Sequence, residues 1–138
     1  MKSLISLLNE SLQQQVFVVL KPGSLDLAQV VIERFAQSGW KVARTTTKQL
    51  LPEEAKKLYE VHKKEDFYKS LCEYMASGPC RAFIFTKPGS QSSKSFKEVA
   101  EIKEEIREKY GESDMRNVLH SSDNSKAMDK EARIFFVL

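Results

Sequence analysis

Apolar and polar residues are arranged along the chain in a way that predicts both strands and helices. The segment "QVFVVL", which ends just before Lys21, is rich in β-branched and aromatic residues and predicts a buried strand that runs into the Pro22-Gly23 turn. Three further segments have the same character, namely "WKVARTTTKQL", "CRAFIFT" and the C-terminal "RIFFV". A short strand is also expected in "RNVLH".

Helices are expected between these strands, where apolar residues recur three and four positions apart. They follow Ser24 and Pro52, begin again after the charged segment "KKED", span residues 95–109, and end with a helix over residues 124–131. The order β-α-β-α-α-β-α-β-α-β contains a βαββαβ core. We therefore predict an α+β fold, a ferredoxin-like sandwich whose antiparallel four-stranded sheet is covered by helices.

Residues 15–138 are expected to form one domain, because a chain of 138 residues suits a single hydrophobic core. Residues 1–14 are interpreted as an extension of this domain. Apolar residues recur in the extension at the spacing of an amphipathic helix, namely Leu4, Ile5, Leu8 and Leu12. A short helix and a loosely ordered terminus fit this segment equally well.

The composition excludes several classes of protein. Hydrophobic residues make up 41% of the chain and charged residues 30%, which is typical of a globular domain rather than a disordered chain. No apolar run approaches the roughly 18 residues that a transmembrane helix needs, so no membrane partner is expected. The net charge of +3 is mild, and nucleic acid is not an expected partner. Cys72 and Cys80 are expected to be free thiols, and we predict a cytoplasmic location.

The segment "RNVLHSSDN" contains the main candidate for a reactive group, His120. A lone histidine is more often an ordinary, partly buried polar residue than a catalyst. Several charged and polar residues would converge on it if the strand ends cluster as the fold implies, and they are Lys21, Arg107, Arg116, Asn117, Ser122 and Glu131. Nearby cations favour a neutral imidazole, whose free nitrogen can attack an electrophile such as a phosphoryl group. Lysine and arginine side chains also neutralise phosphates.

Four segments resemble, in their order, the nucleoside diphosphate kinase family: "VFVVLKP", "YEVHKKEDFYKSLCEYMASGP", "IREKYGESDMRNVLHSSD" and "DKEARIFF". The resemblance extends from Gln15 to Phe136, and the Asn-x-x-His-x-Ser-Asp signature around His120 is specific. The segment "IREKYGESDMRN" is most similar to the divergent class of the family, which includes domains of ciliary and sperm-tail proteins.

The resemblance implies a two-step, ping-pong reaction. His120 would take the terminal phosphoryl group of a nucleoside triphosphate, usually ATP, and pass it to a nucleoside diphosphate. Glu131 would hold the other ring nitrogen and fix the tautomer with help from Ser122. Tyr59 would lie beside the histidine. Mg²⁺ would be the cofactor, held mainly by the nucleotide phosphates rather than by a metal site of the protein.

The resemblance also implies the nucleotide-binding residues. Lys21 and Asn117 would contact the ribose hydroxyls, with Lys21 also reaching the phosphates and acting in catalysis, and Arg107 would bind phosphate. Phe67 and Leu71 would form the lip that holds the base, since a spacing of four places them on one face of a helix. An aromatic ring stacks on any base, so base discrimination would be weak. The simpler interpretation, that both lip residues belong to the core, stays open.

The chain departs from the family pattern in three places. "KPGSLDLAQ" is shorter than the usual segment and lacks its arginine, and the Gly-x-Thr-Asn-Pro sequence is absent from "SFKEVAEIKEE". The missing segment normally supplies a second phosphate-binding arginine, for which Lys94 or Lys97 could substitute. Asp114 replaces an aliphatic residue that faces the base. The shorter loop argues against a hexamer, and we expect a homodimer built on the sheet edge and the helix after Ser24.

Two other functions stay open. The domain could be a kinase-like module of low or no activity that binds nucleotides or acts as a scaffold, for instance in a cilium. An RNA-binding domain is a further candidate because the RNA recognition motif has a similar βαββαβ sheet, but "CRAFIFT" lacks the paired aromatic pattern of that motif. His62, on the same helical face as Tyr59, is expected to be a partly buried supporting residue.

Overall fold

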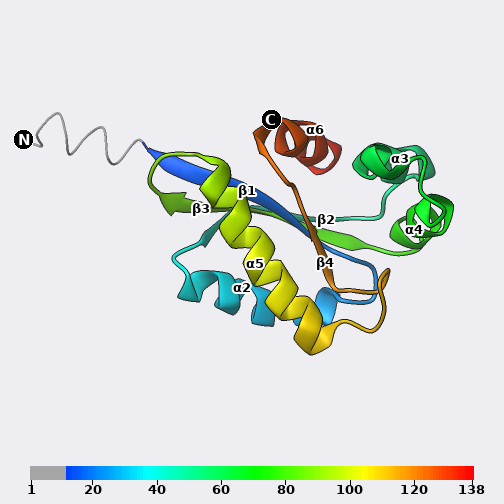
Figure 1. The fold of residues 1–138 in the computed structure, drawn as a ribbon, viewed down its shortest axis with the longest axis horizontal. Helices are drawn as coiled ribbons and strands as arrows, with labels where there is room; N and C mark the ends of the chain where they lie inside the picture. Colours follow the sequence, from blue (N-terminus) through cyan, green and yellow to red (C-terminus); the bar gives the residue numbers. More distant parts are fainter. Residues whose placement is uncertain (1–11) are drawn as a thin grey trace, which may run out of the picture.

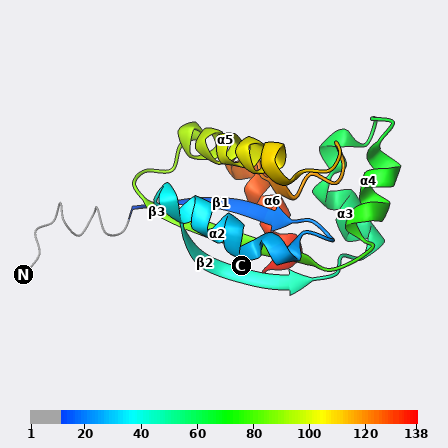
Figure 2. The ribbon, with the colours of Figure 1, turned by 90° about the horizontal axis from the view of Figure 1, so that it is seen from below.

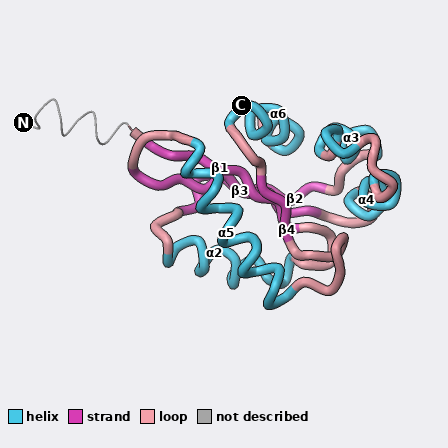
Figure 3. Tube along the Cα trace, viewed as in Figure 1, coloured by secondary structure: helices cyan, strands magenta, loops and turns pink. Residues whose placement is uncertain are grey.

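A computed structural model describes residues 12–138 of the protein. Four strands form one antiparallel sheet in the order β2-β3-β1-β4, and they are β1 (Gln13–Leu20), β2 (Lys41–Lys48), β3 (Cys80–Pro88) and β4 (Leu119–Ser121). The helices are α2 (Ala28–Gln37), α3 (Pro52–Leu58), α4 (Tyr68–Met75), α5 (Ser93–Tyr110) and α6 (Ser125–Phe135), with the short 3₁₀ helices η1 (Leu25–Leu27) and η2 (Glu60–His62). The predicted ferredoxin-like fold is confirmed, because β1, α2, β2, β3, α5 and β4 form the βαββαβ core (Figure 3).

Helices cover both faces of the sheet (Figures 1 and 2). α2 and α5 lie on one face, whereas α6 lies on the other, with α3 and α4 beside one end of the sheet. The apolar run of β1 is continuous because its alternate residues enter two different cores. Val16, Val18 and Leu20 belong to the core under α2 and α5, and Phe17 and Val19 belong to the core shared with α3, α4 and α6.

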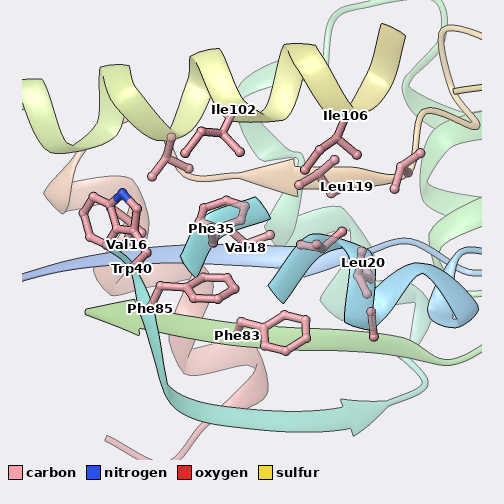
Figure 4. Packing of buried hydrophobic residues seen from close by; sticks show 14 of the residues in the cluster. Val16, Val18, Leu20, Phe35, Trp40, Phe83, Phe85, Ile102, Ile106 and Leu119 are labelled. Carbon is pink, nitrogen blue, oxygen red and sulfur yellow. The ribbon is translucent and has the colours of Figure 1, made fainter. Parts of the chain in front are cut away.

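The core under α2 and α5 is rich in aromatic rings (Figure 4). The rings of Phe35 and Phe85 are stacked, with their centroids 4.3 Å apart and their planes 6° apart. Trp40 is fully buried, and its indole N–H donates a hydrogen bond to Glu98 across 3.0 Å. Glu98 also accepts a hydrogen bond from Lys87 across 2.9 Å. The polar end of the tryptophan is therefore paired although its ring is buried.

The C-terminal segment "RIFFV" is not the strand that its composition predicts. α6 continues to Phe135, and only Phe136 and the residues after it are extended or irregular. Glu131, Ala132 and Phe135 are buried, which is the spacing of one helix face, and the rings of Phe17 and Phe135 lie 5.8 Å apart between centroids. Packing against the sheet therefore outweighed the strand propensity of the β-branched and aromatic residues.

Three of the four apolar positions of the helix predicted for the N-terminal extension fall within residues 1–11, which lie outside the described residues. The fourth, Leu12, is described and is exposed. β1 begins at Gln13, inside the range that was interpreted as an extension. Within residues 12–138, no helix has both the length and the apolar character needed to cross a membrane. Cys72 and Cys80 are buried free thiols, and burial raises the pKa of Cys80 to about 12.

Replacement of Phe85 by alanine should lower the free energy of unfolding by about 3–5 kcal/mol, because it removes a fully buried ring and leaves a cavity beside Phe35. Urea unfolding followed by circular dichroism measures this change. Val137→Ala is the control, since the Val137 side chain is 93% exposed and its loss should change stability by less than about 0.5 kcal/mol. Equal effects of the two substitutions would contradict the packing of Phe85.

Candidate functional site

A cavity of about 590 Å³ opens where the end of β1, β4, α5, α6 and the α3–α4 segment meet. Figures 1 and 2 show the loop between α5 and β4 on the same side of the molecule as α3 and α4. Eight of the nine residues predicted for the site line this cavity, and they are Lys21, Tyr59, Phe67, Leu71, Arg107, Asn117, His120 and Glu131. The ninth, Ser122, does not line it.

His120 lies in the middle of β4, opposite Val19 of β1, and only 18% of its side chain is exposed. Its Nε2 atom is hydrogen-bonded to Oε1 of the buried Glu131, which α6 presents to the cavity. When a carboxylate accepts a hydrogen bond from Nε2–H, a neutral imidazole has its lone pair on Nδ1. Among residues 12–138, Nδ1 has no hydrogen-bond partner. The ring is therefore oriented with one nitrogen available for chemistry.

Four aromatic rings line up from His120 to the mouth of the cavity. The rings of Tyr59 and His120 form a T-shaped pair with their centroids 5.3 Å apart, and the centroid of His62 lies 6.5 Å from that of Tyr59 and 5.5 Å from that of Phe67. Phe67 is 49% exposed, so its ring is accessible at the lip, whereas Leu71 is buried and belongs to the core as well as to the cavity wall. His62 is exposed at the cavity, which corrects the expectation of a partly buried residue.

The hydroxyl groups of Tyr59 and Ser122 are buried without a hydrogen-bond partner among the described residues. Burial raises the pKa of Tyr59 far above its ordinary range, so the phenol stays protonated. Ser122 was predicted to assist Glu131, but its hydroxyl group forms no hydrogen bond with Glu131. Ser122 is instead held through its backbone N–H, which donates to the Phe17 carbonyl across 3.2 Å.

The ammonium group of Lys21 is buried at the end of β1, where the residue is 3% exposed. It donates hydrogen bonds to the Met115 carbonyl across 3.2 Å and to Oδ1 of Asn117 across 2.6 Å. Burial, followed by repulsion from Arg107 and Lys103, lowers the pKa of Lys21 to about 7. A small change of surroundings near neutral pH therefore decides whether this group is charged.

A strained turn leads into β4. Val118 has a φ angle of +79°, in a left-handed region that β-branched residues rarely adopt. The Leu119 N–H donates a hydrogen bond to the Asn117 carbonyl across 3.0 Å, which closes a γ-turn around Val118. Such a conformation costs about 1–3 kcal/mol and needs support from its surroundings. The Lys21 N–H supplies support by donating to the Val118 carbonyl across 2.9 Å.

Arg107 occupies the last turn of α5 and connects this helix to β4. Its Nη2 donates a hydrogen bond to the Leu119 carbonyl across 2.8 Å, while its Nε is buried without a partner among the described residues. Gly111 ends the helix by donating its N–H to the Arg107 carbonyl across 2.8 Å. A Cβ atom on Gly111 would lie 2.5 Å from that carbonyl oxygen, so only glycine allows this close approach.

Lys103 is a further cation that lines the cavity, and the sequence analysis did not predict it. The candidates to replace the absent arginine were Lys94 and Lys97, but neither lines the cavity, because both lie near the start of α5. Lys103 lies one turn before Arg107 and does line it. The spacing of four residues from Arg107 was the available signal, since it places two side chains on one helix face.

The cavity combines an oriented histidine with one buried cation and two half-buried ones, Lys21, Lys103 and Arg107, which is an arrangement suited to a phosphotransferase. Residues 14–137 match the sequence model of the family described as nucleoside diphosphate kinase. The chain therefore belongs to the nucleoside diphosphate kinase family and is a phosphotransferase. The divergent class within the family stays a prediction from the sequence.

Individual relatives agree with this assignment. The chain is 33% identical to a nucleoside diphosphate kinase of Kosmotoga olearia over 132 residues, covering 89% of this chain and 88% of that protein. It is 31% identical to nucleoside diphosphate kinase 1 of Protochlamydia amoebophila, covering 89% and 92% of the two chains. Both relatives are covered over most of their length, so the similarity is not confined to one segment.

Solved structures show the same fold. A crystal form of the Aquifex aeolicus nucleoside diphosphate kinase matches with a TM-score of 0.78 at 26% identity, covering 91% of this chain and 96% of that chain. A halophilic nucleoside diphosphate kinase from Halobacterium salinarum, in complex with CDP, matches with a TM-score of 0.77 at 23% identity, covering 90% and 88%. At that lower identity, the second likeness supports the fold alone.

The change in the free energy of unfolding that Lys21→Met causes should be more favourable at about pH 6 than at about pH 9. The folded-state pKa of about 7 lies below the ordinary value of 10.5, so between these values the unfolded chain holds a proton that the folded chain lacks. Wild-type stability therefore rises with pH through this window, and methionine removes that dependence. Urea unfolding of both proteins at the two pH values measures the difference. A difference that does not change with pH would contradict the lowered pKa.

Proposed function

We propose that this domain is an active nucleoside diphosphate kinase in which His120 carries the phosphoryl group between two nucleotides. The hydrogen bond between Nε2 of His120 and the buried Glu131 is the observation that carries the proposal. It orients the ring and leaves Nδ1 as the nitrogen that can attack a phosphorus atom. The cations around the cavity support the proposal, because phosphoryl transfer depends on positioning and charge neutralisation.

In the first half of the proposed reaction, the Nδ1 lone pair of His120 attacks the γ-phosphorus of a nucleoside triphosphate, usually ATP. The N–P bond forms while the bond to the bridging oxygen breaks, and the nucleoside diphosphate leaves with that electron pair. The second half reverses these steps with a different nucleoside diphosphate. The Nε2 proton stays on the ring throughout, because Glu131 accepts a hydrogen bond from it and stabilises the positive charge that the ring gains.

The nucleotide would lie along the cavity from its lip to His120. Phe67, the exposed ring at the lip, and Leu71 would hold the base. Lys21 and Asn117 already form one hydrogen-bonded pair and would contact the ribose hydroxyls, with Lys21 also reaching the phosphates. Arg107, whose Nε donor is buried and unpaired among residues 12–138, would bind phosphate.

Mg²⁺ would come to the site on the phosphates of the nucleotide. Within residues 12–138, no group of three or more His, Cys, Asp or Glu side chains is placed to hold a metal ion. The carboxylate nearest to the chemistry, Glu131, is engaged by His120. Mg²⁺ prefers phosphate and water oxygens and would supply further charge neutralisation there.

Three features of the protein stay predictions from its sequence, namely the homodimer, the cytoplasmic location and the reduced activity expected from the shortened phosphate-binding segment. The names of the relatives compared above give no support to a ciliary location. The alternative function, a nucleotide-binding module without phosphoryl transfer, predicts nucleotide binding without a labelled phosphoenzyme.

Incubation with Mg²⁺ and γ-labelled ATP should give an acid-labile phosphoenzyme that loses its label when GDP is added. His120→Ala should abolish the label. His62→Ala is the matched control, because His62 is the only other histidine of the chain and should leave the label in place. Nucleotide binding without any label on the wild-type protein would instead support the binding module.

Glu131→Ala should slow phosphoenzyme formation about 10- to 100-fold, the range typical when a group that orients a histidine is removed. It should also produce a mixture of Nδ1- and Nε2-phosphohistidine, because both ring nitrogens then become accessible. Rapid quench kinetics and phosphorus NMR measure the two effects. Glu101→Ala, on the exposed side of α5, is the control. A single Nδ1 isomer formed at the wild-type rate would exclude the orienting role.

A further inference from the structure

Lys103 is a half-buried cation on the wall of the cavity that holds His120. It lies on α5, one helical turn before Arg107, and side chains four residues apart on a helix lie about 5–6 Å apart at their Cβ atoms. Both side chains line the cavity. α5 thus presents two cations, one above the other, to the same space.

Lys103 has no ion-pair or hydrogen-bond partner among residues 12–138. Asp123, Glu104 and Glu131 are near enough to favour its charge, but none of them lies within ion-pair distance. Burial, followed by repulsion from Arg107, lowers the pKa of Lys103. A lysine in such surroundings has its charge stabilised only weakly by the protein itself.

Repulsion connects the cations of the cavity, because Arg107 and Lys103 disfavour the charge of Lys21, and Arg107 disfavours the charge of Lys103. Exposed lysines avoid this cost by pointing into water, as Lys97 does earlier on the same helix. A ligand with several negative charges would offset this repulsion and give Lys103 a charged partner. The phosphate chain of a nucleotide has this character.

We propose that Lys103 binds the phosphate chain of the nucleotide, acting with Arg107 from the same face of α5. The identity of the ligand rests on the proposed function. Lys94 and Lys97 cannot take this role from their own turns of the helix: at 1.5 Å per residue, Lys97 lies about 15 Å along the axis from Arg107. Lys103 lies only about 6 Å from it along the axis.

The test compares the affinities of wild-type protein, Lys103→Met, Lys103→Arg and Lys97→Met for ADP and for adenosine by isothermal titration calorimetry. Lys103→Met should weaken ADP binding about 10- to 100-fold, the effect of losing a charge-assisted hydrogen bond to phosphate, and leave adenosine binding unchanged. Lys103→Arg should restore most of the ADP affinity. Lys97→Met should behave like the wild-type protein, because Lys97 does not line the cavity.

Urea unfolding of Lys103→Met should show unchanged or increased stability, since the substitution removes a poorly compensated charge. Unchanged ADP affinity in this variant would overturn the role of Lys103, and so would an equal loss with Lys97→Met or an equal loss for adenosine. Failure of the proposed function has a different signature, namely a wild-type protein that binds ADP but forms no phosphoenzyme. The ADP comparison decides the role of Lys103 in that case as well.

Discussion

The ammonium group of Lys21 joins the end of the central strand to the loop that precedes His120. Its side chain donates hydrogen bonds to Met115 and Asn117, and its backbone N–H donates to Val118. The segment after α5 is thereby anchored to β1 immediately before β4 begins. β4 then pairs with β1 in the register that places His120 opposite Val19. The position of the candidate phosphoryl carrier therefore depends on a cation that the fold keeps out of water.

Several features of the site oppose folding. The cations of the cavity repel one another, and Val118 is held in a strained conformation next to the central strand. Two apolar clusters, one on each face of the sheet, offset these costs and fix the elements that surround the cavity. The functional side chains thus lie at the border of a rigid scaffold, and a polyanionic ligand would relieve the electrostatic part of the cost.

The strands and helices that pack in regular periods were predictable from the sequence, because burial imposes a period of two or of about 3.6 on apolar residues. "RIFFV" was misassigned, since its composition fits a strand while its spacing fits the buried face of α6. The site residues came largely from a family resemblance. Lys103 was not predicted, because only the spacing of four residues from Arg107 indicates its position at the cavity. The γ-turn at Val118 has no local sequence signal either, since a β-branched residue disfavours a positive φ angle.

The distribution of the site over the chain has a consequence for protein synthesis. Lys21 emerges from the ribosome long before Asn117 and Glu131, and the pairing of Val18 with Ser121 cannot form until β4 has been made. Until then, the apolar run of β1 lacks one neighbouring strand and the part of its cover that α6 provides, so apolar surface of the central strand stays exposed. A nucleotide bound at this site can therefore stabilise the folded state only after residues 117–131 have been synthesised.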